Sequence, residues 1–117
     1  MVEDEPEFRD MVVRTLRRLG YDVAEASGGQ AALDIASGRE TDFDLLLTDV
    51  YMPDLHGPAL VRQLMDRHPA LRTLYMSGFT DREALQREVG DSGLEFLQKP
   101  FRAADLSRRV GALLQAS

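Results

Sequence analysis

The chain has 117 residues, of which 44% are hydrophobic and 29% are charged, with a formal net charge of -6 and no cysteine. This length and balance predict a single packed soluble domain. The acidic charge argues against nucleic acid as a direct partner, because phosphate backbones attract patches of Lys and Arg. The lack of cysteine excludes disulfides, zinc–thiolate sites and cysteine nucleophiles.

The sequence also shows no pattern typical of a targeting segment. No apolar run approaches the roughly 18 residues of a membrane span, and no signal-peptide pattern is present. We therefore expect a cytoplasmic protein without a membrane partner.

In chain order, the hydrophobic pattern alternates between helical spacing and short strand-like runs. Helices are predicted over residues 6–19, 28–38, 58–68 and 80–89, with a last one carrying Leu106, Val110, Leu113 and Leu114. Strands are predicted over residues 21–26, 44–49, 73–78 and 94–99, after a first one that ends at Glu3, Asp4 and Glu5. This alternation predicts one α/β domain over residues 1–117, with a doubly wound parallel sheet and helices on both faces.

The functional crevice of such a sheet lies at the carboxyl ends of its strands. The predicted strands end in polar residues, namely Glu3, Asp4, Glu5, Asp49, Ser77 and Lys99. Carboxylates gathered at one edge repel one another unless a cation lies among them, and oxygen ligands with open positions suit Mg²⁺. A carboxylate that accepts a phosphoryl group needs a metal ion and a further cation. We therefore interpret Asp49 as a nucleophile, with Lys99 as that cation.

Four motifs carry a resemblance to a known family. "VEDE", "LLLTDVYMPDLHG", "YMSG" and "FLQKPF", in this order and spacing, resemble the receiver domain of two-component response regulators. The resemblance covers essentially the whole chain. The details of "YMSGFTD" and "FLQKPF" are most similar to receivers at the C-terminus of hybrid histidine kinases.

The resemblance implies a flavodoxin-like fold of five parallel strands in the order 2-1-3-4-5 with five helices. Only Met1 and Val2 precede the acidic pair, so we expect a truncated first strand.

The resemblance also implies a role for each motif residue. Asp49 is the phosphoacceptor, and Glu3, Asp4, Asp49 and the backbone carbonyl of Tyr51 hold Mg²⁺. Ser77 is the switch hydroxyl, Phe96 the switch aromatic and Lys99 the phosphate-binding lysine, joined to Pro100 by a cis peptide bond.

The implied function is a phosphoacceptor switch in a phosphorelay. A histidine kinase or a histidine phosphotransfer domain donates the phosphoryl group, and a downstream protein binds the last two strand–helix units, from Phe79 to Val89, Phe96 and the final helix. Any catalysis is confined to phosphorylation and dephosphorylation of Asp49 itself, without turnover of an external substrate.

Other interpretations stay open for parts of this pattern. The chain as a whole could be a receiver-fold interaction module that no longer phosphorylates. The acidic run could be a solvated helix start, and Phe96 could be ordinary core. An aspartate-nucleophile phosphatase is disfavoured, because Tyr51 stands where a second acid is expected. Tyr51 and Phe79 should crowd the attacking water and slow dephosphorylation, unless Tyr51 turns to solvent.

Overall fold

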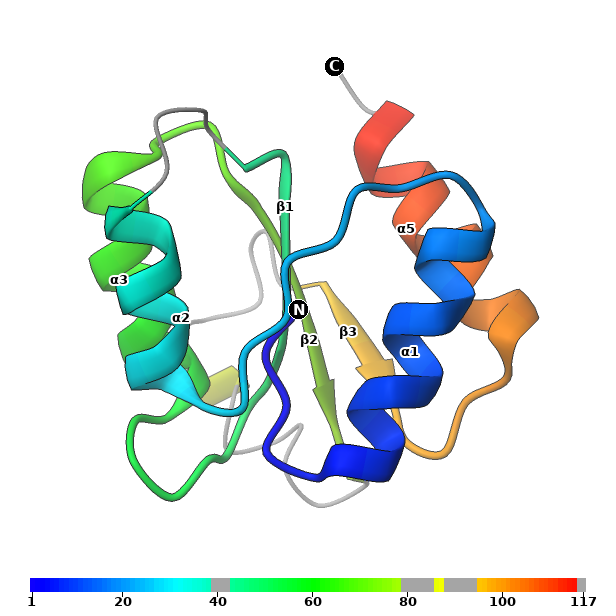
Figure 1. Ribbon diagram of the computed structural model, residues 1–117, viewed down its shortest axis with the longest axis horizontal. Helices are drawn as coiled ribbons and strands as arrows, with labels where there is room; N and C mark the ends of the chain where they lie inside the picture. The colour runs from blue at the N-terminus through cyan, green and yellow to red at the C-terminus, as the bar shows by residue number, and fades with distance from the viewer. Residues whose placement is uncertain (39–42, 79–85, 88–94, 116–117) are drawn as a thin grey trace.

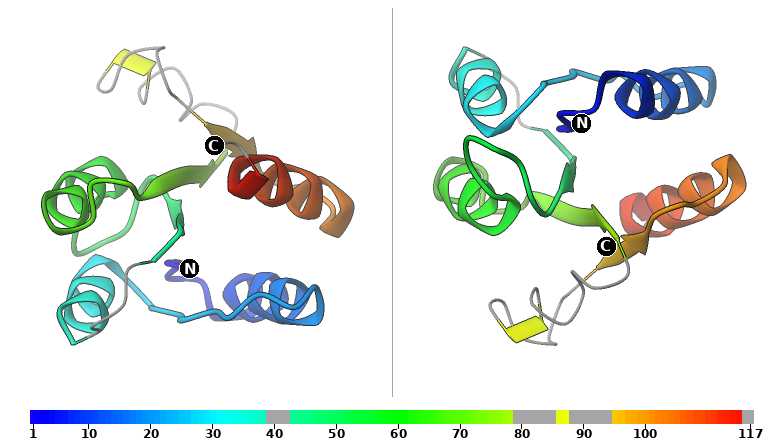
Figure 2. Two further views of the ribbon diagram at one scale, coloured as in Figure 1. Left: turned by 90° about the horizontal axis from the view of Figure 1, so that it is seen from above. Right: turned by 90° about the horizontal axis from the view of Figure 1, so that it is seen from below.

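The computed structural model describes residues 1–38, 43–78, 86–87 and 95–115, and these form three layers, with a parallel sheet between two pairs of helices (Figure 1). The helices are α1 (Pro6–Arg18), α2 (Gly29–Ser37), α3 (Gly57–Arg67) and α5 (Ala103–Gln115). The strands are β1 (Leu45–Asp49), β2 (Arg72–Ser77) and β3 (Phe96–Gln98). Both views of Figure 2 show α2 and α3 at one side of the sheet and α1 and α5 at the other.

The predicted strand order is confirmed. β1 pairs with β2 and β2 with β3, all in parallel, and Val2 forms parallel bridges to both Ala26 and Thr48. The segment at Val2 therefore lies between the segment at Ala26 and β1. When the segments at Val2 and Ala26 are counted as the first and second strands and β1, β2 and β3 as the third to fifth, the order is 2-1-3-4-5. The truncated first strand is confirmed as well, because among the described residues it contributes only this bridging position.

The strand predicted over residues 21–26 is largely wrong. Only Ala26 bridges to a neighbour, and the preceding residues are irregular. Backbone pairing reaches back to Ala24, whose carbonyl accepts a hydrogen bond from the Met1 nitrogen at 2.9 Å. A strand needs a ladder partner along its length, and the bridge to Val2 supplies one only at Ala26. The helix predicted over residues 80–89 falls almost entirely outside the described residues.

Alternate residues of the buried strands supply the two halves of the core, as a pleated strand requires. Leu46 packs with Leu60 and Leu64 on the side of α2 and α3. Leu47 packs with Val12 and Leu106 on the side of α1 and α5. This burial on both faces fixes the direction in which the strand ends point.

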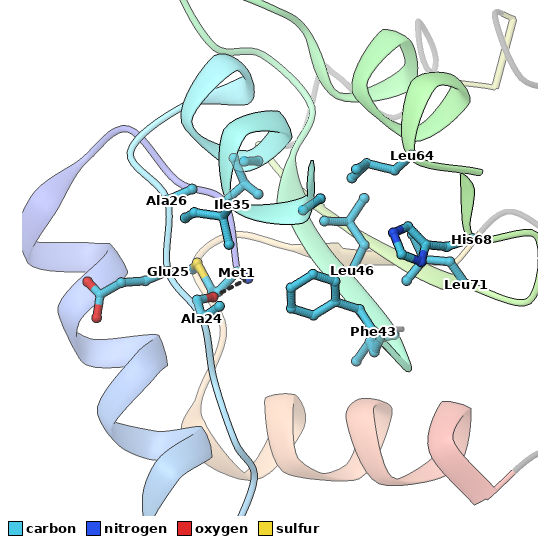
Figure 3. A pocket seen from close by; sticks show the side chains of 14 residues that line it. Met1, Ala24, Glu25, Ala26, Ile35, Phe43, Leu46, Leu64, His68 and Leu71 are labelled. Atoms are coloured by element: carbon cyan, nitrogen blue, oxygen red, sulfur yellow. Dashed lines mark hydrogen bonds between the residues drawn. The ribbon is translucent and has the colours of Figure 1, made fainter. Parts of the chain in front are cut away.

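The core has a gap beside the short first strand. A cavity of about 40 Å³ lies there, lined mostly by apolar side chains and also by Glu25 and His68 (Figure 3). Its lining includes Met1, Ala24, Ala26, Ile35, Phe43, Leu46, Leu64 and Leu71. Within the described ranges, no helix is both long and apolar enough to cross a membrane.

Candidate functional site

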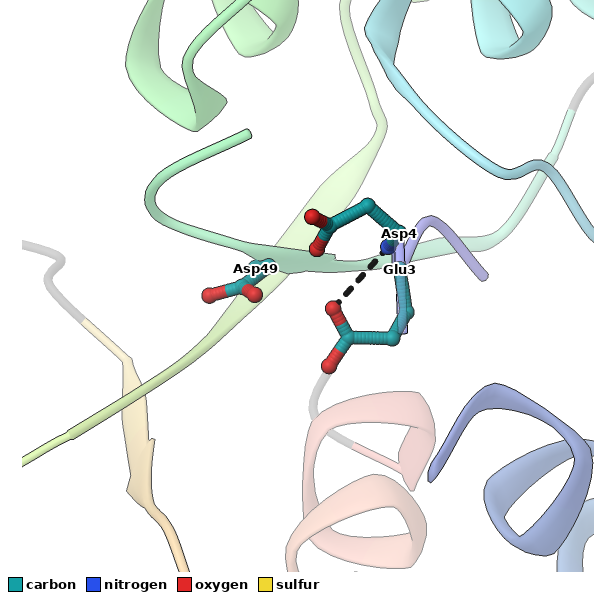
Figure 4. Close-up of side chains that lie close together, drawn as sticks. All are labelled: Glu3, Asp4 and Asp49. Carbon is teal, nitrogen blue, oxygen red and sulfur yellow. Dashed lines mark hydrogen bonds between the residues drawn. The ribbon is translucent and has the colours of Figure 1, made fainter. Parts of the chain in front are cut away.

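Three carboxylates meet at the carboxyl end of the sheet. Glu3 and Asp4 follow the Val2 bridge, and Asp49 ends β1. One oxygen from each side chain lies within 4.8 Å of the others. Figure 4 shows the three side chains close together. Glu3 is completely buried, whereas Asp4 is exposed, so the cluster opens to solvent on one side.

Lys99 completes the cluster from the far end of the chain. Its Nζ donates to Oε1 of Glu3 at 2.5 Å and to Oδ2 of Asp49 at 3.2 Å. Its backbone N–H donates to the carbonyl of Ser77 at 2.8 Å, which ties the end of β3 to the end of β2. The expected cis bond between Lys99 and Pro100 is confirmed.

The surroundings of this cluster shift the pKa values of Glu3 and Lys99. The pKa of Glu3 is raised to about 7, chiefly by burial and further by the neighbouring carboxyl of Asp49, against the opposing effect of Lys99. Burial alone would lower the pKa of Lys99, but its hydrogen bond to Glu3 and the charge of Asp49 outweigh burial and raise that pKa.

The other predicted site residues flank this cluster. Ser77 is buried at the end of β2. Phe96 is buried against Val50 and Tyr75, which is the packing expected of an ordinary core residue. The Tyr51 side chain is 48% exposed and lies beside His56, with ring centroids 6.4 Å apart. Tyr51 thus turns to solvent, so it does not support the predicted crowding; Phe79 lies outside the described residues.

Glu5 has a structural task rather than a place in the cluster. Its carboxylate caps α1 by accepting hydrogen bonds from the backbone N–H groups of Glu7 at 3.2 Å and Phe8 at 2.7 Å. The solvated helix start considered for the acidic run therefore applies to Glu5 and not to Glu3.

The loop between β1 and α3 is anchored at two points that the sequence did not reveal. The Gly57 N–H donates to the carbonyl of Val50 at 2.6 Å, and a Cβ at Gly57 would come within 2.6 Å of the Asp49 carbonyl oxygen. The carboxylate of Asp54 accepts from the N–H groups of Gly29 at 3.1 Å and Gln30 at 3.0 Å. The sequence feature that could have revealed the role of Asp54 is the glycine at the start of α2. Glycine has no side chain with which to cap a helix, so a residue from elsewhere can supply the cap.

Two further residues support the cluster from α1. Arg9 donates to the backbone carbonyl of Glu3 at 2.9 Å and pairs with Glu25 at 3.5 Å. Phe8 lies beneath Lys99. From the sequence, Phe8 was predicted only to lie in the helix over residues 6–19.

The arrangement defines a class of protein: a parallel α/β domain with an acidic cluster and a lysine at the strand ends. The chain belongs to the response regulator receiver domain family, whose model matches residues 1–111. Receiver domains of two-component systems act as phosphoacceptors, generally bind Mg²⁺ at an acidic site, and interact with histidine kinases or phosphotransfer proteins and with downstream effectors.

Particular relatives agree with this assignment. Sensor kinase CckA of Brucella abortus is 35% identical over 115 residues, which are 98% of this chain and 12% of that protein. The response regulator receiver protein CpdR of the same organism is 29% identical over 117 residues, covering 100% of this chain and 96% of CpdR.

Solved structures agree as well. The receiver domain from the hybrid histidine kinase CckA has a TM-score of 0.80 and 35% identity, over 97% of this chain and 95% of that one. The receiver domain of NtrX from Brucella abortus has a TM-score of 0.86 and 27% identity, over 99% of this chain and 97% of that one. The similarity to CckA matches the predicted resemblance to receivers of hybrid kinases.

Proposed function

We propose that Asp49 takes a phosphoryl group from a phosphohistidine on a histidine kinase or a histidine phosphotransfer domain, with the help of Mg²⁺. The observation that carries this proposal is the position of Asp49, whose Oδ2 lies 3.2 Å from the ammonium of Lys99 and close to two further carboxylates. A strand-end aspartate with a turn role alone would need neither the lysine nor the acidic neighbours.

The donor set fits Mg²⁺. All its side chains offer carboxylate oxygen, and the exposed Asp4 leaves a path to solvent, where waters and a phosphate oxygen can complete the shell. Glu3, Asp4, Asp49 and the backbone carbonyl of Tyr51 would hold the ion. The bound ion supplies positive charge that offsets the repulsion between Asp49 and the incoming phosphoryl group.

The chain's own residues then direct the transfer. An oxygen of Asp49 forms the new P–O bond as the P–N bond of the phosphohistidine breaks, and the electron pair of that bond leaves with the imidazole. Lys99 donates a hydrogen bond to an equatorial oxygen of the group in transfer. Glu3, which is buried, keeps the lysine at the crevice before the donor arrives.

Phosphorylation then changes the partner surface. The new group adds roughly -1.5 to -2 charge at neutral pH, which should draw Lys99 and Ser77 toward it. We infer that this shifts an existing conformational equilibrium toward the state in which Phe96 points inward, as it already does in this structure, and that a downstream protein binds the resulting surface on the last two strand–helix units. Of that surface, Phe96 and α5 are described here, whereas most of residues 79–89 is not.

The direct experiment measures phosphoryl uptake. The protein should gain one phosphoryl group from a small phosphodonor only when Mg²⁺ is present, as followed by intact mass. Asp49→Asn should gain none. Uptake by Asp49→Asn equal to the parent would refute the assignment, and no uptake by the parent would favour the alternative of an interaction module that does not phosphorylate.

The metal ligands can be tested separately by calorimetric titration with Mg²⁺. Asp4→Asn should weaken binding far more than the matched variant Glu5→Gln, because Glu5 is engaged in capping α1. Lys99→Ala should leave Mg²⁺ binding largely intact and impair the conformational response to phosphorylation. Equal losses in the Asp4 and Glu5 variants would contradict the proposed ligand set.

A further inference from the structure

The ammonium of Lys99 lies between two different surfaces. On one side are the carboxylates of Glu3 and Asp49, at 2.5 and 3.2 Å. On another is the ring of Phe8, whose centroid is 4.5 Å from Nζ. This distance is well within the roughly 6 Å over which an aromatic face attracts a cation.

The ring of Phe8 is itself held in place. Phe101 meets it edge to face, with centroids 5.3 Å apart and planes at 76°. Phe101 is two residues beyond Lys99, so the segment that carries the lysine also braces the ring below it. The helix turn that carries Phe8 is fixed by the hydrogen bond from its N–H to Glu5.

The two surfaces respond differently to a metal ion. Glu3 and Asp49 are among the proposed Mg²⁺ ligands, and an ion bound to them competes with Lys99 for their oxygens. The ring of Phe8 is not a ligand for Mg²⁺, so a bound ion leaves the attraction between the ring and the ammonium in place. Without the ring, the Lys99 side chain, which has four rotatable bonds, would gain conformational entropy by moving into solvent.

We propose that Phe8 is a positioning residue for Lys99: its ring holds the ammonium at the crevice once Mg²⁺ occupies the carboxylates, so that the lysine is in place for the phosphoryl group. The inference rests on the proposed phosphoacceptor function. It predicts that removing the ring weakens binding of the phosphoryl group while leaving Mg²⁺ affinity unchanged.

Beryllium trifluoride, a mimic of the phosphoryl group, provides the test. In saturating Mg²⁺, Phe8→Leu should bind it about 3- to 20-fold more weakly than the parent, which corresponds to an ordinary cation–π contact. Phe8→Tyr keeps the ring and should restore most of the affinity. In a Lys99→Met background, Phe8→Leu should cause no further loss, since the interaction is then already absent.

A purely structural role for Phe8 would give a different pattern. An equal loss of affinity in the parent and Lys99→Met backgrounds would overturn the proposal, because the ring would then act through packing alone. A loss of Mg²⁺ affinity in Phe8→Leu as large as its loss of beryllium trifluoride affinity would also overturn it.

A second measurement separates this inference from the proposed function. In the metal-free parent, the ring should shift the ¹H signals of the Lys99 ε-methylene upfield, and Phe8→Leu should remove that shift. Absence of the shift in the parent overturns the positioning role. A parent that shows the shift yet never binds beryllium trifluoride would contradict the phosphoacceptor function instead.

Discussion

The two ends of the sheet bury charge in contrasting settings. At the carboxyl end, the buried Glu3 is paired with Lys99 and faces other groups that could share a metal ion. At the amino end, the ammonium of Met1 is bonded to the carbonyl of Ala24 and lies between the 40 Å³ cavity and a larger hollow of about 290 Å³. Burial raises the pKa of Glu3 to about 7 and lowers that of Met1 to about 6.

Burial of a charged group therefore has different consequences for function at the two ends of the sheet. At the carboxyl end, the polar groups that disfavour folding are those that the proposed chemistry uses. At the amino end, the buried ammonium of Met1 bonds to the carbonyl of Ala24, at the opposite end of the sheet from the proposed site residues. We infer that stability can be changed at the amino end without changing the site, and that changes at the site alter stability and binding together.

The largest effect on stability is expected from enlarging the gap in the core. Leu64 is buried and lines the cavity, so Leu64→Ala should lower the free energy of unfolding by about 2–5 kcal/mol. Chemical denaturation measures this, with the exposed neighbour Met65→Ala as a control that should change it by less than about 0.5 kcal/mol. If folded Leu64→Ala bound Mg²⁺ much more weakly than the parent, the two ends would not be independent.

A smaller effect concerns Glu3 and pH in the absence of metal. The pKa of Glu3 is raised from 4.5 to about 7, so between these values the folded state holds more protons than the unfolded state. The contribution of Glu3 to stability therefore falls as pH rises through this window. Relative to the parent, Glu3→Gln should gain on the order of 2 kcal/mol from pH 4.5 to pH 7.5.

Denaturation at a series of pH values measures that gain. Comparing Glu3→Gln with the parent cancels the opposite trend from Met1, whose lowered pKa makes stability rise between about pH 6 and 8 in both proteins. A difference that does not vary with pH would mean that Glu3 is not destabilised by its burial.

The smallest effect is expected at the loop beside the site. Hydrogen bonds from the N–H groups of Gln30 and Gly29 lower the pKa of Asp54, so its stabilisation is present at neutral pH and is lost as pH falls below 3.8. Asp54→Ala should lower the melting temperature by roughly 2–4 °C at pH 7, as the loss of a helix cap does. The difference between the variant and the parent should shrink as pH falls below 3.8.

Asp10→Ala is the control for Asp54. Asp10 forms an exposed pair with Arg14 on α1, and such pairs contribute little. A melting temperature lowered equally by both variants would show that loss of surface charge, rather than loss of the cap, is what thermal unfolding detects.

Much of this architecture could be predicted from local pattern. Helical spacing of apolar residues predicted a helix over residues 6–19, which matches α1 (Pro6–Arg18) closely. The apolar run before Asp49 located β1, because a strand buried on both faces needs apolar residues throughout. The strand predicted at residues 21–26 failed because strand pairing depends on a neighbour, which is not a property of the segment itself.

The sequence by itself determined which functional groups stand at the ends of strands, because that depends only on the order of residues along the chain. Only the tertiary structure decided which of them touch. Lys99 reaches Glu3 across 96 positions of sequence, Asp54 caps a helix that begins 25 residues earlier, and Phe8 lies beneath a lysine from the other end of the chain. Contacts of this kind arise from how the layers pack, and no local periodicity encodes them.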